Sequence, residues 1–326
     1  MPDAWLPALS IPAAILPTAV YVLFVWWIDR YEKEPWRWLV AVFLWGAFPA
    51  VAIAIALQLT FDVPLTSLMP QHSALVSVSI VGPLIEEAAK AVPLVVLYAL
   101  ARHELDGPLD GIIYGSLIGF GFAMTENVLY FLGATGGGAA SWLMLVLGRA
   151  VVFGLNHAMF TSLFGIGLTL AAHKPSASHR WALAVLGFGG AVTAHFFHNF
   201  FLSVGDFCLI SLALDYLGVG LVLATIVLAW RREKRWLQTF LSDEVEQGML
   251  SPEEFVIISS WRRRVIQRWR RMSAGRRAQA RAWNRLVHDA TDLAFKKRQY
   301  MRRPNDRLAQ RIEALRQRIQ EERALL

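Results

Sequence analysis

Three ionisable residues, Glu86, Glu87 and Lys90, stand in the middle of the apolar stretch "SVSIVGPLIEEAAKAVPLVVLYAL". Carboxylates and amines can bind a cation, move a proton or activate water, but each charge costs about 2.5–3.5 kcal/mol at the centre of a membrane helix. An embedded charge therefore indicates a functional site by default. Because Lys90 follows Glu86 by four residues, the two share a helix face and can pair. A purely structural ion pair is the alternative reading.

Further polar residues are embedded in other apolar segments of the chain. Two of them, Glu126 and Arg149, bring the embedded charges to five, which would cost on the order of 12–18 kcal/mol if unpaired. That cost exceeds the net stability of a typical domain, about 5–15 kcal/mol. The charges must therefore face one another or a water-filled pocket inside a helix bundle. The uncharged polar residues in the same segments are His157, His195, His198, Asn127, Asn156 and Asn199.

Carboxylate and imidazole groups around trapped water are suited to hydrolysis. A glutamate can act as general base for water, and His and Asn can donate hydrogen bonds to the oxyanion that forms. The sequence contains neither a G-x-S-x-G motif nor an H-E-x-x-H zinc-binding helix. His157 and His195 together with a glutamate could still bind Zn²⁺ as a His₂Glu set. No cofactor follows with certainty, and a metal-free site remains open.

The candidate residues divide into two groups by their expected roles. The candidate catalytic residues are Glu86, Glu87, Glu126, His157, His195 and Asn199. The candidate supporting residues are Lys90, Asn127 and Arg149, with Arg149 expected to pair with a pocket acid. Successive helical residues differ by 100°, so at most one carboxylate of the glutamate pair points straight into the pocket. Which glutamate is the base stays open, and His198 is expected to be structural.

The elements that carry these residues are predicted to be membrane-spanning helices. The chain has 326 residues, of which 56% are hydrophobic and 17% charged, against about 25% charged in soluble domains. A span needs about 20 apolar residues, and seven candidates are found: 8–28, 37–60, 74–101, 109–132, 141–172, 181–203 and 208–230. The fifth is over-long and could be tilted or broken near Gly154, which would make eight. The fold class is an all-α polytopic membrane helix bundle.

Basic residues in the loops predict the orientation of the bundle, because cytoplasmic loops are enriched in Lys and Arg. Every basic loop falls on one side, and the alternate loops contain no Lys or Arg. We therefore expect the N-terminus outside and the C-terminus in the cytoplasm. The residues that carry this bias are Arg30, Lys33, Arg37, Arg102, Lys174, Arg180, Arg231, Arg232, Lys234 and Arg235. The single cysteine, Cys208, excludes an internal disulfide.

The last part of the chain differs in charge from the rest. Residues 1–230 hold 8 Lys/Arg and 13 Asp/Glu, a net charge of −5, whereas residues 231–326 hold 24 and 12, a net charge of +12. We predict a transmembrane domain over 1–230, which carries the candidate hydrolytic residues, and a basic helical cytoplasmic tail over 231–326. The helices expected in the tail are 233–247, 252–272, 276–301 and 305–324, with Gly248 as a helix stop and a capping box from Ser251 to Glu254.

The charge of this basic tail is compatible with three roles. Anionic lipid is favoured, because a polybasic segment next to a membrane is attracted to it. Solvated faces of a small helical domain, or a hairpin that binds a partner protein, are the alternative. Nucleic acid is not expected, because no nucleic-acid-binding motif is present.

Four motifs occur in order on successive predicted spans: "EEAAK", "FAMTEN", "NHAMFTSLFGIGLTLA" and "AHFFHNF", covering about residues 80–203. Together they resemble the PrsW family of intramembrane proteases, which is related to the CAAX-type prenyl endopeptidases. The resemblance implies a peptidase in the bacterial plasma membrane, with its site built from the paired glutamates, Glu126, His157, and His195 with Asn199. It also implies a single-pass membrane protein as substrate, with the first cut of an anti-sigma factor as the best-known role. The family is classed as metalloprotease while its relatives are argued to be metal-free, so the metal question stays open.

Two functions of other classes remain as alternatives to an intramembrane endopeptidase. Embedded Glu, Lys and His also occur in ion- or proton-coupled transporters, although the internal repeats usual in transporters are not found here. A membrane scaffold that binds peptide without cutting it would retain its phenotype when Glu86 is replaced by Gln. The sequence determines neither the physiological substrate nor the oligomeric state.

Overall fold

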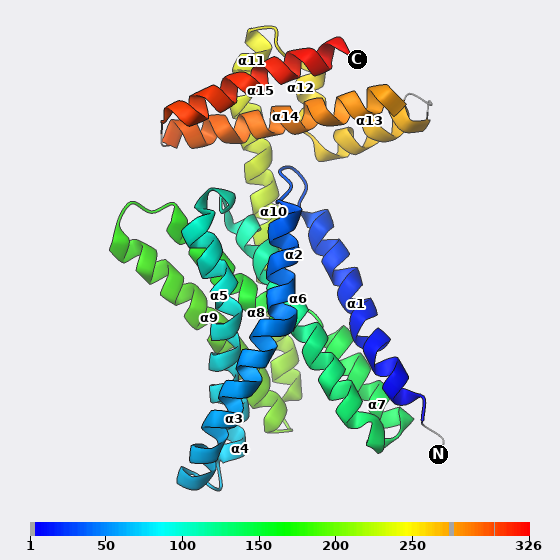
Figure 1. Ribbon diagram of the computed structural model, residues 1–326, viewed down its shortest axis with the longest axis vertical. Helices are drawn as coiled ribbons and strands as arrows, with labels where there is room; N and C mark the ends of the chain where they lie inside the picture. Colours follow the sequence, from blue (N-terminus) through cyan, green and yellow to red (C-terminus); the bar gives the residue numbers. More distant parts are fainter. Residues whose placement is uncertain (1–3, 274–276, 303) are drawn as a thin grey trace. The chain divides into compact units, whose positions relative to one another are not determined.

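The computed structural model of the chain describes residues 4–273, 277–302 and 304–326. Every regular element in these ranges is helical (Figure 1), which confirms the predicted all-α class. The chain folds as two compact units. The membrane unit comprises Met1–Asp29 and Glu34–Ile226, and the C-terminal unit comprises Arg30–Lys33 and Val227–Leu326. The assignment of a transmembrane protease domain to 1–230 and of a basic cytoplasmic tail to 231–326 stays a prediction.

The membrane unit is a bundle of long helices joined by short turns and by π-helical segments. Its elements are α1 (Leu6–Ile28), α2 (Trp36–Trp45), η1 (Gly46–Ala50), α3 (Val51–Leu68), α4 (Ser73–Val76), η2 (Ser77–Val81), α5 (Gly82–Leu100), η3 (Arg102–Glu104), α6 (Pro108–Gly133), η4 (Ala134–Gly137), α7 (Ala139–Val146), η5 (Leu147–Val152), α8 (Asn156–Ala172), α9 (Ala177–Ser203) and the first part of α10 (Cys208–Phe240). Helix α6 packs against α1, α2 and α8, and α8 packs in turn against α5 and α9.

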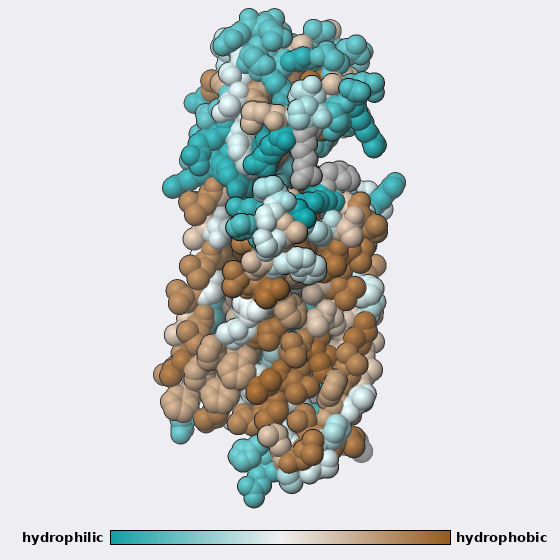
Figure 2. All heavy atoms as spheres, turned by 90° about the vertical axis from the view of Figure 1, so that its left-hand side faces the viewer, coloured by the Kyte–Doolittle hydropathy of each residue, from teal (hydrophilic) through white to brown (hydrophobic). Residues whose placement is uncertain are grey.

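Among the described residues, six helices are long and apolar enough to cross a membrane. They contain six of the seven predicted spans. The remaining span, 74–101, is a continuous helix through α4, η2 and α5, but Glu86, Glu87 and Lys90 make it less apolar than the other six. The exterior of the membrane unit is apolar, with Val63 74% exposed and Leu209 75% exposed, and Figure 2 shows brown, hydrophobic side chains over it. The chain is a multi-pass membrane protein, and its orientation stays a prediction.

The over-long fifth span is broken at residues 153–155, where a turn separates η5 from α8. Gly154 lies in this turn, and a Cβ there would overlap the carbonyl oxygen of Ala150 and approach the Tyr21 hydroxyl. Tyr21 donates a hydrogen bond of 2.9 Å to that carbonyl oxygen, which satisfies a backbone group freed by the break, as a membrane interior requires. The break places His157 in the first turn of α8.

Close packing of α6 against α8 depends on three glycines spaced four residues apart. A Cβ on Gly111, Gly115 or Gly119 would overlap the backbone of α8, at Gly165, Ser162 and His157 respectively. Small residues at this spacing let two membrane helices approach with their backbones nearly in contact. The approach sets the distance between the last turns of α6 and the first turn of α8, which carry candidate site residues.

The C-terminal unit has its own hydrophobic core. Its helices are the end of α10, α11 (Ser242–Glu246), α12 (Pro252–Ile258), α13 (Trp261–Ser273), α14 (Arg277–Arg302) and α15 (Asp306–Ala324). Its core includes the fully buried side chains of Leu237, Leu286, Leu293, Leu315 and Ile319. Figure 2 shows teal, hydrophilic side chains over much of its outer surface.

Two of the predicted tail helices are wrong in their extent. The predicted helix 233–247 is not separate, because α10 runs on to Phe240. The predicted helix 252–272 is two helices, interrupted at residues 259–260. Arg264 Nε donates to the carbonyl oxygen of Ile258 at 2.6 Å, so a side chain satisfies a carbonyl that the end of α12 leaves open. The predicted capping box of Ser251 and Glu254 is confirmed.

Candidate active site

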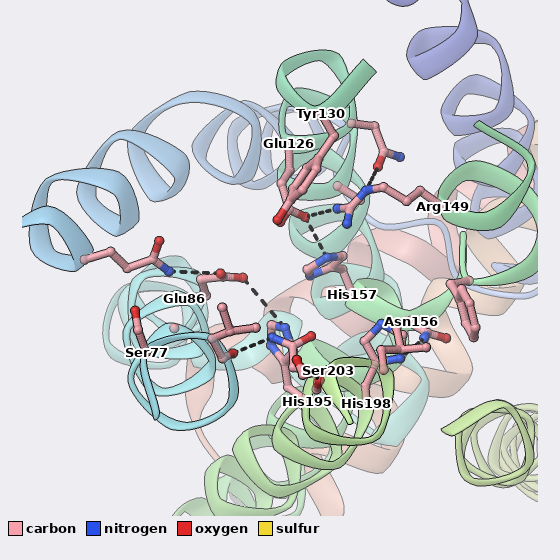
Figure 3. Close-up of a pocket in the computed structure, with 18 residues that line it drawn as sticks. Ser77, Glu86, Glu126, Tyr130, Arg149, Asn156, His157, His195, His198 and Ser203 are labelled. Atoms are coloured by element: carbon pink, nitrogen blue, oxygen red, sulfur yellow. Dashed lines mark hydrogen bonds and ion pairs between the residues drawn. The ribbon is translucent and has the colours of Figure 1, made fainter. Parts of the chain in front are cut away.

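A pocket of about 300 Å³ lies in the membrane unit and is lined by α3, η2, α5, α6, η5, α8 and α9 (Figure 3). It has room for several water molecules. The predicted site residues that line it are Glu86, Glu126, Asn127, Arg149, His157, His195 and Asn199. Glu87 and Lys90 do not line it and are buried behind its wall. Side chains from four helices and one π-helical segment therefore converge on one polar centre.

Glu86 presents one carboxylate oxygen to the cavity without a hydrogen-bond partner. Its Oε1 accepts a hydrogen bond of 3.1 Å from Gln58 Nε2 on α3. Its Oε2 is buried and has no hydrogen bond in the structure. Lys90 Nζ lies 3.7 Å and His195 Nε2 lies 3.8 Å from Oε2. This oxygen is available to accept a proton or to bind a cation.

Glu87 is fully engaged by its neighbours and is 2% exposed. Its Oε1 accepts hydrogen bonds from Lys90 Nζ at 2.7 Å and from His195 Nδ1 at 3.0 Å. Its Oε2 accepts one from the Thr161 hydroxyl at 3.2 Å. The expectation that only one of the paired glutamates faces the pocket matches this geometry. Lys90 lies within ion-pair distance of Glu86, as its spacing predicts, but gives its short hydrogen bond to Glu87.

Glu126 joins α6 to η5 and α8 at the opposite side of the cavity. Its Oε2 lies 2.8 Å from an Arg149 guanidinium nitrogen and 2.9 Å from His157 Nε2. Arg149 Nε also donates to Asn127 Oδ1 at 2.9 Å, and its guanidinium stacks over the Tyr130 ring. Arg149 thus pairs with a pocket acid, as its embedded position predicts (Figure 3).

Each histidine of the centre has a carboxylate on one ring nitrogen, and these partners assign the tautomers. His195 donates from Nδ1 to Glu87, so its Nε2 carries a lone pair that faces Glu86 Oε2. The Lys90 ammonium can only donate, so His157 Nδ1 accepts from Lys90 Nζ at 3.0 Å. The proton of His157 is then on Nε2, which lies 2.9 Å from Glu126 Oε2. His195 Nε2 and Glu86 Oε2 face each other at 3.8 Å with no hydrogen bond between them.

This arrangement fits a divalent metal in its donor set. Glu86, His157 and His195 each offer one ligand atom, all within 4.8 Å of one another, and His₂Glu is a set that catalytic zinc uses. Metal-bound histidines usually donate their second nitrogen to a carboxylate, as both do here. Lys90 shares His157 Nδ1, so a metal bound at that nitrogen would displace this contact.

Asn199 lines the cavity but directs its amide elsewhere. Its Nδ2 donates to the backbone carbonyl oxygen of Val78 in η2 at 2.9 Å, which ties α9 to η2. The role expected from the sequence, donation to an oxyanion, would require this amide to leave Val78, and that role stays a prediction.

A second polar cluster beside the cavity contains a residue that the sequence interpretation missed. Asp215 of α10 is 3% exposed, and its Oδ2 accepts from Asn156 Nδ2 at 2.9 Å and lies 2.8 Å from His198 Nδ1. Ser211 Oγ joins the same carboxylate at 3.3 Å. Asp215 lies eight residues into the predicted span 208–230, so its embedded charge was a signal of the same kind as Glu126. The structural role expected for His198 agrees with these contacts.

Several known proteins are similar in sequence to this chain. The chain is 29% identical over 183 residues to the protease PrsW of Geobacillus kaustophilus, covering 55% of this chain and 74% of that protein. It is 34% identical over 155 residues to the protease PrsW of Clostridioides difficile, covering 47% of this chain and 61% of that protein. To the protease PrsW of Shouchella clausii it is 28% identical over 191 residues, covering 59% and 82%. No solved structure matches the chain.

A sequence model of one family matches residues 34–231, a range that contains every residue of the polar centre and more than half of the chain. The named relatives are all proteases, so the enzymatic activity expected from the sequence motifs is confirmed. The chain belongs to the PrsW family of intramembrane metalloproteases.

Proposed function

We propose that Glu86, His157 and His195 form the hydrolytic centre of this intramembrane protease, and that it cleaves single-pass membrane proteins. One observation carries the proposal. Glu86 Oε2 is a buried carboxylate oxygen without a hydrogen-bond partner, in a polar cavity, facing the lone pair of His195 Nε2. A buried polar group without a partner costs about 1–3 kcal/mol, and this cost is explained if the oxygen is kept for the reaction.

The residues of the cavity supply a complete route for hydrolysis. Glu86 Oε2 takes a proton from a water molecule as the water oxygen bonds to the carbonyl carbon of the substrate. The carbonyl oxygen becomes negatively charged, and the Arg149 guanidinium, which lines the cavity, donates hydrogen bonds to it. The proton then passes from Glu86 to the amide nitrogen as the carbon–nitrogen bond breaks.

The remaining charged residues hold these groups in place. Glu87 orients His195 through Nδ1, and Lys90 balances the charge of Glu87 at 2.7 Å. Glu126 orients His157 and is itself held by Arg149. We assign Glu87, Lys90 and Glu126 as positioning residues in this route, because their side chains act through the histidines and the cavity glutamate.

Zinc would be held by Glu86, His157 and His195, and when bound it would polarise the carbonyl and lower the pKa of its water. With Glu86 engaged as a ligand, Glu126 would be the carboxylate left in the cavity to hold a proton. The family description as metalloprotease and the carboxylate behind each histidine both support this form of the site.

The substrate class follows from the place of the cavity. It lies inside a unit whose exterior is apolar, so a polypeptide segment must reach it from within the membrane or from its boundary. A single-pass protein with an extended stretch next to its span fits that requirement. An anti-sigma factor, whose cleavage releases a stress response, is a protein of this class.

The test compares the N-termini of membrane proteins in cells that carry the wild-type chain, Glu86→Gln or the control Glu321→Gln, which changes an exposed acid on α15. We expect new termini near a transmembrane segment with the wild type and the control, and none with Glu86→Gln. The same termini with a stably expressed Glu86→Gln protein would overturn the proposed role of Glu86. Equal termini in all strains and in cells without the chain would favour a transporter or scaffold.

A further inference from the structure

Helix α13 of the C-terminal unit exposes large apolar side chains among arginines. Ile266 is 51% exposed, Trp269 66% and Met272 48%. The basic side chains exposed on the same helix are Arg262, Arg263, Arg268 and Arg270. A helix that faces only water keeps Trp and Ile on its buried side, so this face indicates a second, partly apolar surrounding.

Ile266 and Trp269 share one side of α13 with three of the exposed arginines, Arg262, Arg263 and Arg270. Arg268 lies 200° from Ile266, on the side of the buried Arg264. At 100° per residue, Trp269 lies 60° from Ile266 on one side and Arg270 lies 40° from it on the other. Arg262 falls between Ile266 and Trp269 one turn earlier. Apolar side chains flanked by arginines, whose stems can extend toward phosphates, are typical of helices that lie at a membrane surface.

The opposite side of α13 is fixed to the C-terminal unit, so the outward face cannot turn inward. Arg264 is buried there and donates to the carbonyl oxygen of Ile258 at 2.6 Å and to the Thr291 hydroxyl at 2.8 Å. Burial lowers the pKa of Arg264 to about 10, so this anchoring side chain is charged at neutral pH.

The start of α13 lies beside residues that mark the end of membrane spans. Within the C-terminal unit, the Arg30 guanidinium stacks over the Trp230 ring at 3.3 Å and lies 4.5 Å from the Trp261 ring centre. Arg30 follows α1 by two positions, and Trp230 is the last residue of the predicted span 208–230. Trp and Arg gather where spans leave the membrane. Trp261, the first residue of α13, therefore contacts the group that marks this boundary.

We propose that α13 lies in the membrane–water interface, with Ile266 and Trp269 among the acyl chains of anionic phospholipids and its arginines on their phosphates. The exposed apolar pair selects a bilayer over a soluble anion, because a free phosphate has no apolar part to cover Trp269. The side of α13 that carries Ile266 and Trp269 also carries three exposed arginines, which match the negative surface of an anionic leaflet. This role is independent of the hydrolytic centre.

The test uses the full chain in nanodiscs, with Cys208→Ser to remove the single native cysteine. A fluorescent label is attached at Trp269→Cys or at Met272→Cys on α13, and at Gln320→Cys on α15 as the control. Nanodiscs contain phosphatidylcholine alone or mixed with phosphatidylglycerol, with bromine on the acyl chains as quencher. We expect about twofold quenching of both α13 labels in the anionic nanodiscs, less in phosphatidylcholine, and none at position 320.

Charge reversal supplies the second measurement, with the label at Met272→Cys. Arg262→Glu with Arg270→Glu should abolish the dependence of quenching on phosphatidylglycerol. The matched pair Arg281→Glu with Arg307→Glu, on exposed arginines of α14 and α15, should leave it unchanged. Unquenched labels at both α13 positions would overturn the proposal and leave this face to a protein partner. Equal loss with both charge-reversed pairs would also overturn it, because the effect would then follow net charge alone.

Discussion

Glu86 and Glu87 are neighbours in the chain, yet their carboxylates have different surroundings. The 100° between them turns Glu86 into the cavity and Glu87 toward Lys90, His195 and Thr161. One carboxylate is left with an unpaired oxygen, and the other has both oxygens occupied. The same substitution at the two positions should therefore have different consequences.

We predict that Glu86→Gln abolishes cleavage while the protein keeps its thermal stability. Loss of a general base lowers the rate by about 10²–10⁴-fold, whereas Glu86 Oε2 makes no hydrogen bond that the amide would lose. Glu87→Gln should lower the melting temperature as well, because removing one partner of a buried ion pair costs about 3–5 kcal/mol and Lys90 is fully buried. Cleavage of a single-pass reporter in proteoliposomes and thermal unfolding in detergent measure the two effects. Equal thermal loss in both variants would contradict the distinction.

If the site holds zinc, the amount of bound metal should depend on the histidines and on the carboxylates behind them. The purified wild-type protein should bind about one zinc ion per chain, and His195→Ala should lose it. Glu87→Gln should weaken zinc affinity by about 10–100-fold, since a carboxylate behind a ligand histidine orients it. The control His72→Ala changes an exposed histidine outside the cavity and should bind zinc normally. Elemental analysis after dialysis against zinc provides the stoichiometry. A metal-free wild-type protein with full activity would exclude the metal form and leave Glu86 as the base.

Among the elements, α6 and α8 determine how Glu126 and His157 meet. Their backbones approach closely because Gly111, Gly115 and Gly119 carry no Cβ. The last of these glycines lies against the backbone of His157 itself. The packing of α6 against α8 at these glycines is therefore directly linked to the geometry of the site.

We expect Gly119→Ala to reduce cleavage by about 10²-fold, because a displacement of about 1 Å at a catalytic group has that effect. Overpacking should also destabilise the protein by about 1–3 kcal/mol. Gly189→Ala on α9 is the matched control, since its Cβ would meet no atom within 4 Å. Reporter cleavage by both variants at equal expression tests whether the α6–α8 contact positions the site. Full activity of Gly119→Ala would show that α8 can shift without loss of catalysis.

At the scale of the whole molecule, the two units differ in the side chains that they enclose and expose. The membrane unit encloses a polar cavity and exposes apolar side chains. The C-terminal unit encloses a hydrophobic core together with one fully buried acid, Glu244, whose Oε1 lies 2.9 Å from Lys297 Nζ and 2.7 Å from Arg316. This carboxylate joins α11 to both α14 and α15.

We predict that Glu244→Ala destabilises the C-terminal unit by about 3–5 kcal/mol, because it leaves Lys297 and Arg316 without their buried partner. Limited proteolysis of the full chain should then cut within 231–326 much faster than in the wild type, while the membrane unit stays intact. The exposed Glu321→Gln again serves as control. An unchanged digestion rate would show that solvent reaches this ion cluster and compensates for the loss.

Much of the fold follows from composition along the chain. Apolar stretches of about 20 residues can bury their backbone polar groups in a membrane only as helices, so the all-α class and the spans were predictable. For the over-long fifth span, the sequence predicts either a tilted helix or a break near Gly154, since length alone cannot separate the two. The structure has the break, at residues 153–155. In the tail, where many arginines blur the apolar pattern, the interruption at residues 259–260 was missed because a side chain, Arg264, stabilises it.

The sequence alone determined that embedded charges must meet in a polar pocket, because hydrocarbon does not tolerate them singly. The residue types and their order also determined the family. Only the tertiary structure decided which atoms meet: Glu86 rather than Glu87 faces the cavity, Asn199 bonds Val78, and Asp215 joins His198. The physical reason is that helical spacing defines directions within one helix, while the rotation and approach of different helices depend on packing between them. That packing brings together residues more than a hundred positions apart, such as Glu87 and His195.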